Sequence, residues 1–484
     1  METLWSIVDR HWWMTVFFLV FLLKGLRTIV NAVAFYCLYR PTPIPEKPTH
    51  TNDDVTVILP SIDGDGPELQ STVRSILSCG PAEILLVTID ANVKRANQMV
   101  KTMGAAAERT VRIMSVAQAN KRRQMCVAIP EVKTKIIIFA DDDVTWGRNL
   151  LPWILAPFED SKMGGVGTNQ RVKRNPELRY LSRAYLWQFL GEMYIRRRNF
   201  DITACTQLDG GLPCLSGRTV AYRAKILQNG DFTHGFQNEK WNGYTLNADD
   251  DNFITRWMVS HGFDTTVQYH PEAEVQTTLE CNPRYLRQCL RWVRSNWRSN
   301  LTTMFVERHT WSRQPWSTYA VQQTTLTAWA LPYDLCLFYT WNLAAQSESL
   351  SQPAFVAGVA LLAAWVVLTK CTKLMPHFVR HPEDIVLLLP VVVMFGYVHG
   401  LIKLWGLVTL NAVSIYCCCC CRYQSTPHAP PANLPLPQTT WGSRPAADED
   451  DDIRMVPPKS RSNITSSLTD CEKKSLHQSL LLPK

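Results

Sequence analysis

The chain has 484 residues, a hydrophobic share of 46% and a formal net charge of +8, so it can hold one large domain plus membrane segments. Its basic residues are clustered, but no nucleic-acid-binding motif accompanies them, which excludes nucleic acid as the expected partner. The 15 cysteines show neither zinc-ligand spacing nor an even disulfide framework. This usage excludes a disulfide-stabilised extracellular scaffold and favours a reducing, cytosolic domain.

The first predicted element is the apolar segment Trp12–Leu38, which is long enough to span a bilayer. Lys24 and Arg27 lie within it and are costly at the bilayer centre, so they must snorkel or face neighbouring helices. An interfacial helix is the alternative. No basic region or small-residue cleavage site accompanies the segment, so we expect no cleaved signal peptide. We predict a membrane helix within residues 1–40, and closely spaced prolines predict a stiff linker over residues 41–54.

An alternation of strands and helices follows the linker. The pattern predicts strands at Val55–Pro60, Glu83–Ile89 and Ile136–Ala140, with a helix at Pro67–Leu77. Strands that alternate with helices imply an α/β domain with a mainly parallel, Rossmann-like sheet covered on both faces. Ligands of such sheets bind at the carboxyl ends of the strands. Asp63, Asp90 and the triplet Asp141 to Asp143 all follow such ends, and we assign residues 55–300 to this cytosolic domain.

Beyond Trp316 the chain becomes apolar again. The strong segments are residues 317–341, 354–368 and 385–416, and we divide the last near His399 because it is too long for one span. This division predicts about four transmembrane helices within residues 301–421. The basic stretch 370–381 is then a cytosolic loop, as the positive-inside rule favours.

The end of the chain is polar and proline-rich. Residues 422–484 are rich in Pro, Ser and charge and are predicted to form a disordered cytosolic tail. Before it, Cys417 to Cys421 form an unbroken cysteine run directly after an apolar segment. Cysteines at a membrane edge are candidates for S-palmitoylation, and plain apolar filling of a helix end is the alternative.

Three adjacent aspartates follow the strand at Ile136–Ala140. Alternate residues at a strand end can point into one site, so Asp141 and Asp143 can supply oxygen ligands to a hard cation. The alternative is a solvated acidic turn. Three neighbouring carboxylates repel one another beside a buried strand, which argues against a purely structural role. The pattern indicates a divalent metal site that neutralises a diphosphate.

A second acidic triplet, Asp249 to Asp251, precedes a helix predicted at residues 252–261. Carboxylates are favoured at a helix N-terminus by the macrodipole, so simple capping is one interpretation. The other is a general base, Asp251 or its neighbour Asp250, that deprotonates an acceptor hydroxyl.

Gln288, Arg291 and Trp292 share one face of a helix predicted at residues 283–300. Arginine can grip a diphosphate bidentately, and tryptophan offers an apolar face to a sugar ring. The helix is also basic and amphipathic, so an interfacial membrane helix is an alternative that can hold at the same time.

Two shorter signals remain open. Ser216 and Gly217 could let backbone approach a ligand closely, or form an ordinary tight turn. Lys121 and Arg122 could meet a diphosphate or a uracil base, or belong to a solvated basic turn.

Taken in this order, the motifs resemble those of membrane-embedded family 2 glycosyltransferases, the group that includes hyaluronan, chitin and cellulose synthases. The stretch from Arg284 to Trp292 is similar to hyaluronan synthases, as is Trp441-Gly442-Ser443-Arg444 near the C-terminus. Among these processive synthases the chain is most similar to the fungal capsule-type members. The resemblance covers roughly residues 50–445.

The resemblance implies a role for each matching residue. It implies Asp141 and Asp143 as the metal- and UDP-binding pair, Asp251 as the catalytic base with Asp250 beside it, Gln288, Arg291 and Trp292 as the diphosphate- and acceptor-binding motif, Ser216 and Gly217 as the acceptor lining, and Lys121 and Arg122 as nucleotide contacts. Asp90 is a displaced candidate for the uridine-binding carboxylate, because the second strand lacks the family's usual acidic pair. Arg218 replaces the usual proline of hyaluronan synthases, so hyaluronan is not transferred as the product.

The expected protein is therefore a GT-A-type enzyme with transmembrane helices, dependent on Mn²⁺ or Mg²⁺. The resemblance implies an inverting transfer from a UDP-sugar to a growing polysaccharide, extruded across the plasma membrane during fungal cell-wall or capsule synthesis. A non-processive transferase acting on a lipid-linked acceptor is one alternative. A catalytically inactive membrane scaffold is another.

Overall fold

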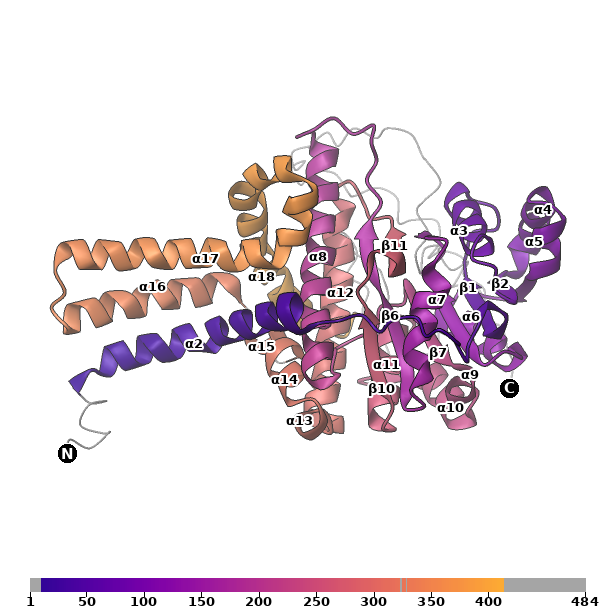
Figure 1. The fold of residues 1–484 in the computed structure, drawn as a ribbon, viewed down its shortest axis with the longest axis horizontal. Helices are drawn as coiled ribbons and strands as arrows, with labels where there is room; N and C mark the ends of the chain where they lie inside the picture. Colours follow the sequence, from indigo (N-terminus) through magenta and orange to yellow (C-terminus); the bar gives the residue numbers. More distant parts are fainter. Residues whose placement is uncertain (1–9, 323, 328, 413–484) are drawn as a thin grey trace, which may run out of the picture. The chain divides into compact units, whose positions relative to one another are not determined.

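A computed structural model describes residues 10–322, 324–327 and 329–412. Nine strands of this part form one mixed, mainly parallel sheet in the order β3-β2-β1-β4-β7-β6-β11-β5, with β10 paired to β6 (Figure 1). The strands are β1 (Val55–Pro60), β2 (Glu83–Ile89), β3 (Val111–Val116), β4 (Ile136–Ala140), β5 (Val144–Trp146), β6 (Met163–Val172), β7 (Thr219–Arg223), β10 (Asp264–Gln268) and β11 (Glu274–Thr277). The antiparallel pairs are β4 with β7, β6 with β7 and β5 with β11. The expected α/β architecture is confirmed, and the predicted bounds of β1, β2 and β4 match.

Helices cover both faces of the sheet. They are α3 (Pro67–Leu77), α4 (Val93–Thr102), α5 (Ala105–Thr110), α6 (Lys121–Ala128), α7 (Leu150–Leu155), α8 (Arg183–Asp209), α9 (Ala224–Leu227), α10 (Gly230–Asn238), α11 (Asp250–Ser260) and α12 (Arg284–Leu301). Successive side chains of β4 enter opposite cores, since Ile136 and Ile138 pack with α3 and α7, whereas Ile137 and Phe139 pack with α6 and α10. Both cores exclude water, which is why β4 reads as an unbroken apolar run. A separate hairpin joins β8 (Lys240–Trp241) to β9 (Tyr244–Thr245).

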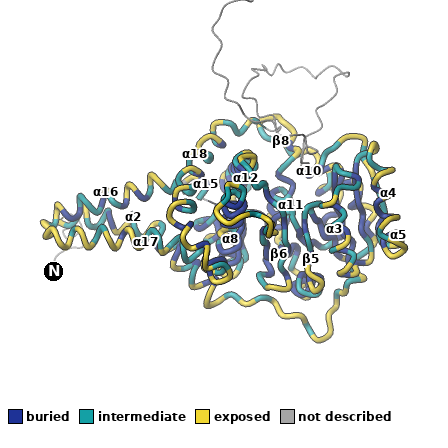
Figure 2. The backbone as a smooth tube through the Cα atoms, turned by 90° about the horizontal axis from the view of Figure 1, so that it is seen from above, coloured by how far each residue is buried: buried dark blue, intermediate teal, exposed yellow. Residues whose placement is uncertain are grey.

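Three helical segments of the described chain are long and apolar enough to cross a membrane: Trp12–Leu38, Gln352–Arg380 and Pro382–Val408. The first comprises α2 (Trp12–Val33) and the π-helical turn η1 (Ala34–Leu38), the second is α17 (Gln352–Arg380), and the third runs through η9 (Pro382–Leu387), η10 (Leu388–Val393) and α18 (Met394–Val408). Helix α16 (Ala330–Ser347) packs with α2 and α17 around Phe17, Leu337 and Leu362. Figures 1 and 2 show α2, α16 and α17 side by side, extending away from the sheet.

The prediction of about four spans after the cytosolic domain is not matched by these helices. Residues 317–341 do not form one helix, because the backbone is extended at Trp329, between the short segments η8 (Thr318–Gln322) and α15 (Thr324–Thr327) on one side and α16 on the other. The division near His399 was also wrong, since α18 continues through it; an isolated glycine costs a helix only about 1 kcal/mol. Residues 413–416 lie outside the described part.

The predicted cytosolic loop at residues 370–381 is helical instead, because α17 continues to Arg380. Its basic residues find partners on other helices: Lys373 pairs with Asp201 of α8 at 2.9 Å. Within α2, Lys24 lies 3.5 Å from Asp334 of α16, and Arg27 donates to the Ala320 carbonyl at 3.2 Å. Both α2 cations therefore face neighbouring helices, one of the two possibilities that the sequence left open.

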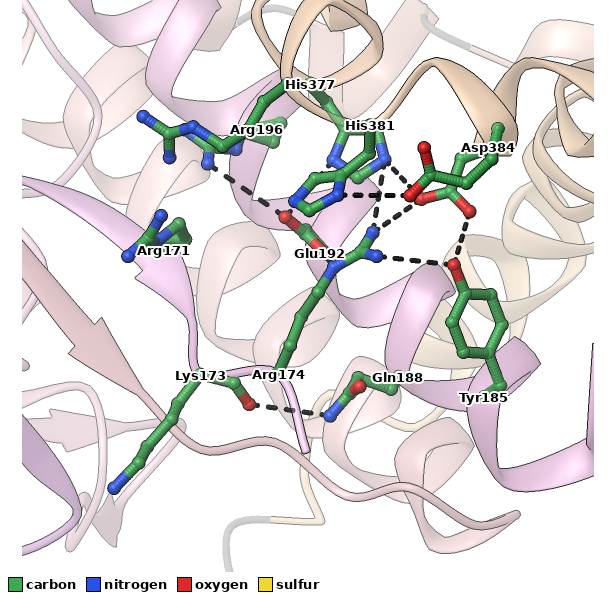
Figure 3. A network of polar contacts seen from close by, with 12 residues as sticks. Arg171, Lys173, Arg174, Tyr185, Gln188, Glu192, Arg196, His377, His381 and Asp384 are labelled. Atoms are coloured by element: carbon green, nitrogen blue, oxygen red, sulfur yellow. Dashed lines mark hydrogen bonds and ion pairs between the residues drawn. The ribbon is translucent and has the colours of Figure 1, made fainter. Parts of the chain in front are cut away.

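A buried polar network joins α8 to the second and third membrane segments (Figure 3). Arg174, just after β6, donates to Glu192 of α8 at 2.7 Å and also binds Asp384 of η9. His377 of α17 lies between the same two carboxylates, 3.1 Å from Glu192 and 2.9 Å from Asp384. Tyr185 of α8 donates to Asp384 as well. Each carboxylate is matched by a cation or a hydrogen-bond donor, so the network fixes the membrane helices to the sheet domain.

This network predicts a loss of stability in acid. Burial alone would raise the pKa of Glu192, but hydrogen bonding to His377 and the charges of His377 and Arg174 lower it from 4.5 to about 2. The stabilisation is therefore complete above pH 4.5 and is lost as the pH falls towards about 2. We expect the melting temperature to fall through this window, with a smaller fall in Glu192→Gln. Glu108→Gln, at an exposed position of α5, is the control and should melt like the wild type. An unchanged acid profile in Glu192→Gln would contradict the assignment.

The remaining short helices lie between α12 and the membrane segments. They are η7 (Thr302–Glu307), α13 (Thr310–Arg313) and α14 (Pro315–Ser317). The proline-rich linker has no helix or strand before the 3₁₀ turn η2 (Asn52–Asp54), and its Thr42 exchanges two hydrogen bonds with Gln268 of β10. The cysteine run Cys417–Cys421, the tail and the Trp441–Arg444 element lie outside the described residues.

Candidate active site

The first acidic triplet stands at the carboxyl end of β4, as predicted. Its side chains diverge: Asp141 meets Lys121, Asp142 accepts from the Ser61 hydroxyl at 2.6 Å, and Asp143 accepts from the Thr278 hydroxyl at 3.2 Å. Enclosure by protein, together with the charge of a neighbouring triplet member, raises the pKa of Asp142 to about 7 and that of Asp143 to about 6. Burial and repulsion within the triplet therefore disfavour the charged forms of Asp142 and Asp143.

A divalent cation fits this donor set. Asp141 and Asp143 repel each other's charge, and a cation between them would relieve that repulsion. No group of three or more His, Cys, Asp or Glu side chains among the described residues is arranged to hold a metal alone. Mg²⁺ typically takes one or two carboxylates plus substrate phosphates, so the remaining ligands would come from a diphosphate and water.

Lys121 joins the two acidic motifs. It is the first residue of α6, a helix whose N-terminus is capped by Asn120, whose side chain accepts from the Arg123 amide at 3.0 Å. Its ammonium lies 2.8 Å from Asp141 and 3.0 Å from Asp250, in a buried position. Burial favours the neutral amine, but the two carboxylates outweigh it and raise the pKa of Lys121. A permanent positive charge therefore stands between β4 and α11.

Asp250 and Asp251 begin α11 and differ in their surroundings. Burial would raise the pKa of Asp250, but the adjacent Lys121 ammonium lowers it. The pKa of Asp251 is raised, first by burial and then by the charge of Asp250. Such a separation leaves one carboxylate as a fixed anion and the other as a proton acceptor, the arrangement expected of a general base beside an electrostatic partner.

Simple capping does not account for the second triplet. Asp249 occupies the N-cap position with a φ of 66°, but its side chain makes no capping hydrogen bond. It binds Arg298 of α12 instead, with its Oδ2 2.8 Å from Nε and 2.7 Å from a terminal nitrogen. One residue of the triplet is therefore structural, which leaves Asp250 and Asp251 for the site.

The loop that carries Ser216 and Gly217 closes over these carboxylates. The Gly217 amide donates to Asp251 at 3.4 Å. A Cβ at Gly217 would stand 3.3 Å from the Lys121 ammonium and 3.5 Å from an Asp250 oxygen. The glycine therefore permits the close backbone approach that the sequence left as one of two interpretations.

Arg218 and Tyr194 extend the site beyond the predicted set. Arg218 donates to Gln170 at 3.1 Å and to Ser216 at 3.2 Å, and its guanidinium lies 5.4 Å from the centre of the Trp292 ring. Tyr194 of α8 also contacts Trp292, and the two rings are stacked with their centres 4.9 Å apart. Arg218 stood out in the sequence as a departure from the family pattern. The sequence analysis missed Tyr194, whose only sequence signal is its own aromatic ring, three positions before Arg197.

Three other predicted residues, Gln288, Asp90 and Arg291, differ in how far they are buried. Gln288 has a buried side-chain oxygen with no hydrogen-bond partner in the described structure, as a ligand-facing group would. Asp90 is exposed at the carboxyl edge of β2, and Arg291 is half-buried on α12. These positions leave their proposed nucleotide contacts open.

Arg122 is not brought to the site. It is almost fully buried and binds the carbonyls of Phe236 and Ala248 and the carboxylate of Glu239. On a helix, consecutive residues point in different directions, so Lys121 and its neighbour face opposite surroundings. Arg122 therefore holds α6 against α10 and the loop before α11.

Comparison with known proteins shows the family of the chain. The family model described as "Glycosyltransferase like family 2" matches residues 52–295. A protein from Zymoseptoria tritici named "Type 2 glycosyltransferase" is 51% identical over 448 residues, which is 92% of this chain and 87% of that protein. Hyaluronan synthase 2 of Rattus norvegicus is 27% identical over 192 residues, 38% of this chain and 32% of that one. The chain belongs to glycosyltransferase family 2.

A solved structure supports the fold assignment. The mannosyltransferase PcManGT from Pyrobaculum calidifontis, in complex with GDP-Man and Mn²⁺, superposes with a TM-score of 0.52 and 14% identity, covering 83% of this chain and 99% of that one. At this identity the likeness concerns the fold alone. The sheet domain is of the GT-A type, and the protein is a glycosyltransferase.

Proposed function

We propose that this glycosyltransferase moves a sugar from a UDP-sugar to the end of a growing polysaccharide, with inversion at the anomeric carbon. The observation that carries the proposal is the position of Lys121. Its ammonium contacts both Asp141 at the end of β4 and Asp250 at the start of α11, so the two acidic motifs lie in one site. A donor diphosphate and an acceptor hydroxyl must meet in such a place.

The proposed reaction assigns each group one task. Asp251 takes the proton of the acceptor hydroxyl, and the hydroxyl oxygen attacks the anomeric carbon. The bond from that carbon to UDP breaks, and UDP leaves with the electron pair. Lys121 and Arg291 would hold the diphosphate, and Trp292 with Ser216 and Gly217 would hold the acceptor end. A Mn²⁺ or Mg²⁺ ion held by Asp141 and Asp143 would neutralise charge on the diphosphate when bound.

The proposed setting is the plasma membrane, with the sheet domain on the cytosolic face and the polymer extruded between the membrane helices. Three candidate spans and many exposed apolar side chains on α2 and α17 support membrane insertion. The resemblance of the motifs to fungal capsule-type synthases supports a role in building a fungal cell wall or capsule.

The decisive experiment uses the full chain in lipid nanodiscs with Mn²⁺. UDP-glucose, UDP-N-acetylglucosamine and UDP-glucuronic acid are offered singly and in pairs, and UDP release and product size are followed. UDP release with a long polymer is the expected result. Release with short or lipid-linked product only would favour the non-processive alternative, and absence of release with every donor would favour the inactive scaffold.

The metal proposal makes a separate prediction. Asp143→Asn is expected to lower sugar transfer by about 10²-fold, because the diphosphate loses part of its charge neutralisation. It should also remove the dependence of UDP binding on added Mn²⁺, which calorimetry of UDP with and without chelator measures. The matched control is Asp264→Asn, at an exposed aspartate that begins β10. Wild-type metal dependence in Asp143→Asn would contradict the assignment.

A further inference from the structure

Three arginines from three elements converge on one carboxylate, where α17 meets the sheet domain. They are Arg171 of β6, Arg196 of α8 and Arg380 of α17, here called the arginine triad. Their guanidinium nitrogens lie 2.9, 4.0 and 3.6 Å, in that order, from the carboxylate oxygens of Glu274, the first residue of β11. These distances place three positive charges around one negative charge.

Glu274 satisfies only part of the triad. Among the described residues it is the only carboxylate within 4.0 Å of Arg171 or of Arg380. A charged hydrogen bond from nitrogen to oxygen is about 2.7–2.9 Å long, and only Arg171 comes that close to Glu274. The Arg380 guanidinium therefore has no carboxylate at hydrogen-bond distance.

Arg196 supplies a second, independent observation. Its Nε and Nη2 atoms are buried and have no hydrogen-bond partner in the described part of the chain. The neighbouring carboxylate of Glu192 lies 3.9 Å away and already binds the Arg174 guanidinium at 2.7 Å. A buried guanidinium without hydrogen bonds is costly, so the triad calls for a further acceptor.

The triad opens to the surface on one side. Arg380 exposes 43% of its side chain and Arg171 exposes 26%, whereas Arg196 exposes only 4%. In Figure 3, Arg171 and Arg196 lie on one side of Glu192, and Asp384 of the polar network lies on the other. An anion can therefore reach the two outer guanidiniums without entering that network.

The chemistry of the triad suits a phosphate group. A guanidinium is planar and can donate two parallel hydrogen bonds to the oxygens of a phosphate or a carboxylate. The two oxygens of Glu274 are already shared among three arginines. A phosphate monoester adds three acceptor oxygens and about −1.5 to −2 charges near neutral pH, which supplies what the carboxylate lacks.

The position of Arg380 favours a lipid phosphate over a free one. Arg380 ends α17, the second candidate membrane span. Along that helix Leu361, Leu368, Met375 and Val379 expose their apolar side chains. Spacings of seven and four residues place these side chains on one helix face, which acyl chains can cover. A phospholipid along this face brings its headgroup to the end of α17, next to Arg380.

Given the membrane setting proposed above, we propose that the arginine triad binds the phosphate headgroup of an anionic membrane phospholipid. Basic pockets between membrane helices are suited to such headgroups. Because Arg171 belongs to the sheet and Arg380 to a membrane segment, the bound headgroup would join the two parts. The site also lies beside the candidate active site, since Gln170, which precedes Arg171, accepts a hydrogen bond from Arg218.

The test measures which lipid the full chain retains. The chain in detergent micelles is incubated with equal amounts of phosphatidic acid and phosphatidylcholine that carry the same acyl chains. After repurification, the retained lipids are quantified by mass spectrometry. Phosphatidic acid is expected to be enriched about tenfold, because arginines near a membrane surface attract anionic lipids. Equal retention of the two lipids, or retention of neither, would overturn the inference.

Variants locate the effect. Arg171→Gln and Arg380→Gln should each lower the enrichment about threefold, because each removes one of the exposed guanidiniums. Arg183→Gln, at an exposed arginine that begins α8, is the matched control and should retain the wild-type enrichment. Melting temperatures establish that each variant is folded. An enrichment that survives both triad variants would overturn the assignment to this site.

Soluble glycerol 3-phosphate separates a lipid from a free phosphate. It carries the same phosphate monoester without acyl chains, and in excess it should leave the bound phosphatidic acid in place. Displacement of the lipid would overturn the lipid assignment. Failure of the chain to enter lipid nanodiscs would overturn the membrane setting and this proposal with it. UDP release reports on the transfer reaction separately, so failure of one is distinguishable from failure of the other.

Discussion

Asp251→Asn is expected to lower the rate of sugar transfer by about 10²–10⁴-fold, because the acceptor hydroxyl loses its proton acceptor. The amide keeps the shape of the side chain and can still accept a hydrogen bond from the Gly217 amide. UDP-sugar binding should therefore stay within about threefold of the wild type, since the change touches a group that acts in the transition state. Single-turnover kinetics and equilibrium titration of the donor measure the two quantities.

The pH dependence sharpens this test. Because the pKa of Asp251 is raised, wild-type transfer should fall as the pH drops through that raised value. The residual rate of Asp251→Asn should lack this fall. The matched control is Asp231→Asn, which alters another aspartate in the first turn of a helix, at an exposed position of α10. Wild-type turnover in Asp251→Asn would refute the base assignment.

Lys121→Met is expected to destabilise the protein by about 3–5 kcal/mol and to abolish transfer, because it leaves two carboxylates of the site without their shared cation. Asp141 and Asp250 lie within 3.0 Å of the ammonium, and Lys121 and Asp250 are both buried. Thermal unfolding of the protein in nanodiscs measures the stability, and UDP release measures the activity.

A double variant separates the two effects. Adding Asp250→Asn to Lys121→Met removes one of the stranded charges, so part of the melting temperature should return while transfer stays absent. Lys101→Met, at an exposed lysine of α4, is the control and should change neither quantity. A stable, active Lys121→Met protein would show that the two acidic motifs do not depend on their common cation.

The sequence alone predicted the elements whose pattern of apolar and polar side chains follows from which side chains are buried and which meet water. β1, β2, β4 and α3 have the expected bounds, because a strand buried on both faces is apolar throughout and a surface helix is apolar on one side only. The first acidic motif was found in the same way, since carboxylates directly after an apolar strand stand out, and the second was found as a triplet at the start of a predicted helix.

The membrane segments were harder to predict. Hydropathy measures the apolar content of a stretch, and it cannot reveal whether a polar residue inside the stretch finds a partner on another helix. Helix α17 continues through Lys373 because Asp201 is there to receive it. The stretch at residues 317–341 holds more polar residues than α17, and its helical path is interrupted at Trp329, directly before α16.

Only the tertiary structure decided which charged residues share a site. Lys121 and Arg122 are adjacent in the sequence, yet one joins the two acidic motifs and the other is buried against α10. Asp249 and Asp251 are only two positions apart, yet Asp249 binds Arg298 and Asp251 accepts a hydrogen bond from the Gly217 amide. Local sequence determines where a strand or helix begins, because that depends on the chain's own polarity. The partner of a charge depends on distant segments that packing brings together.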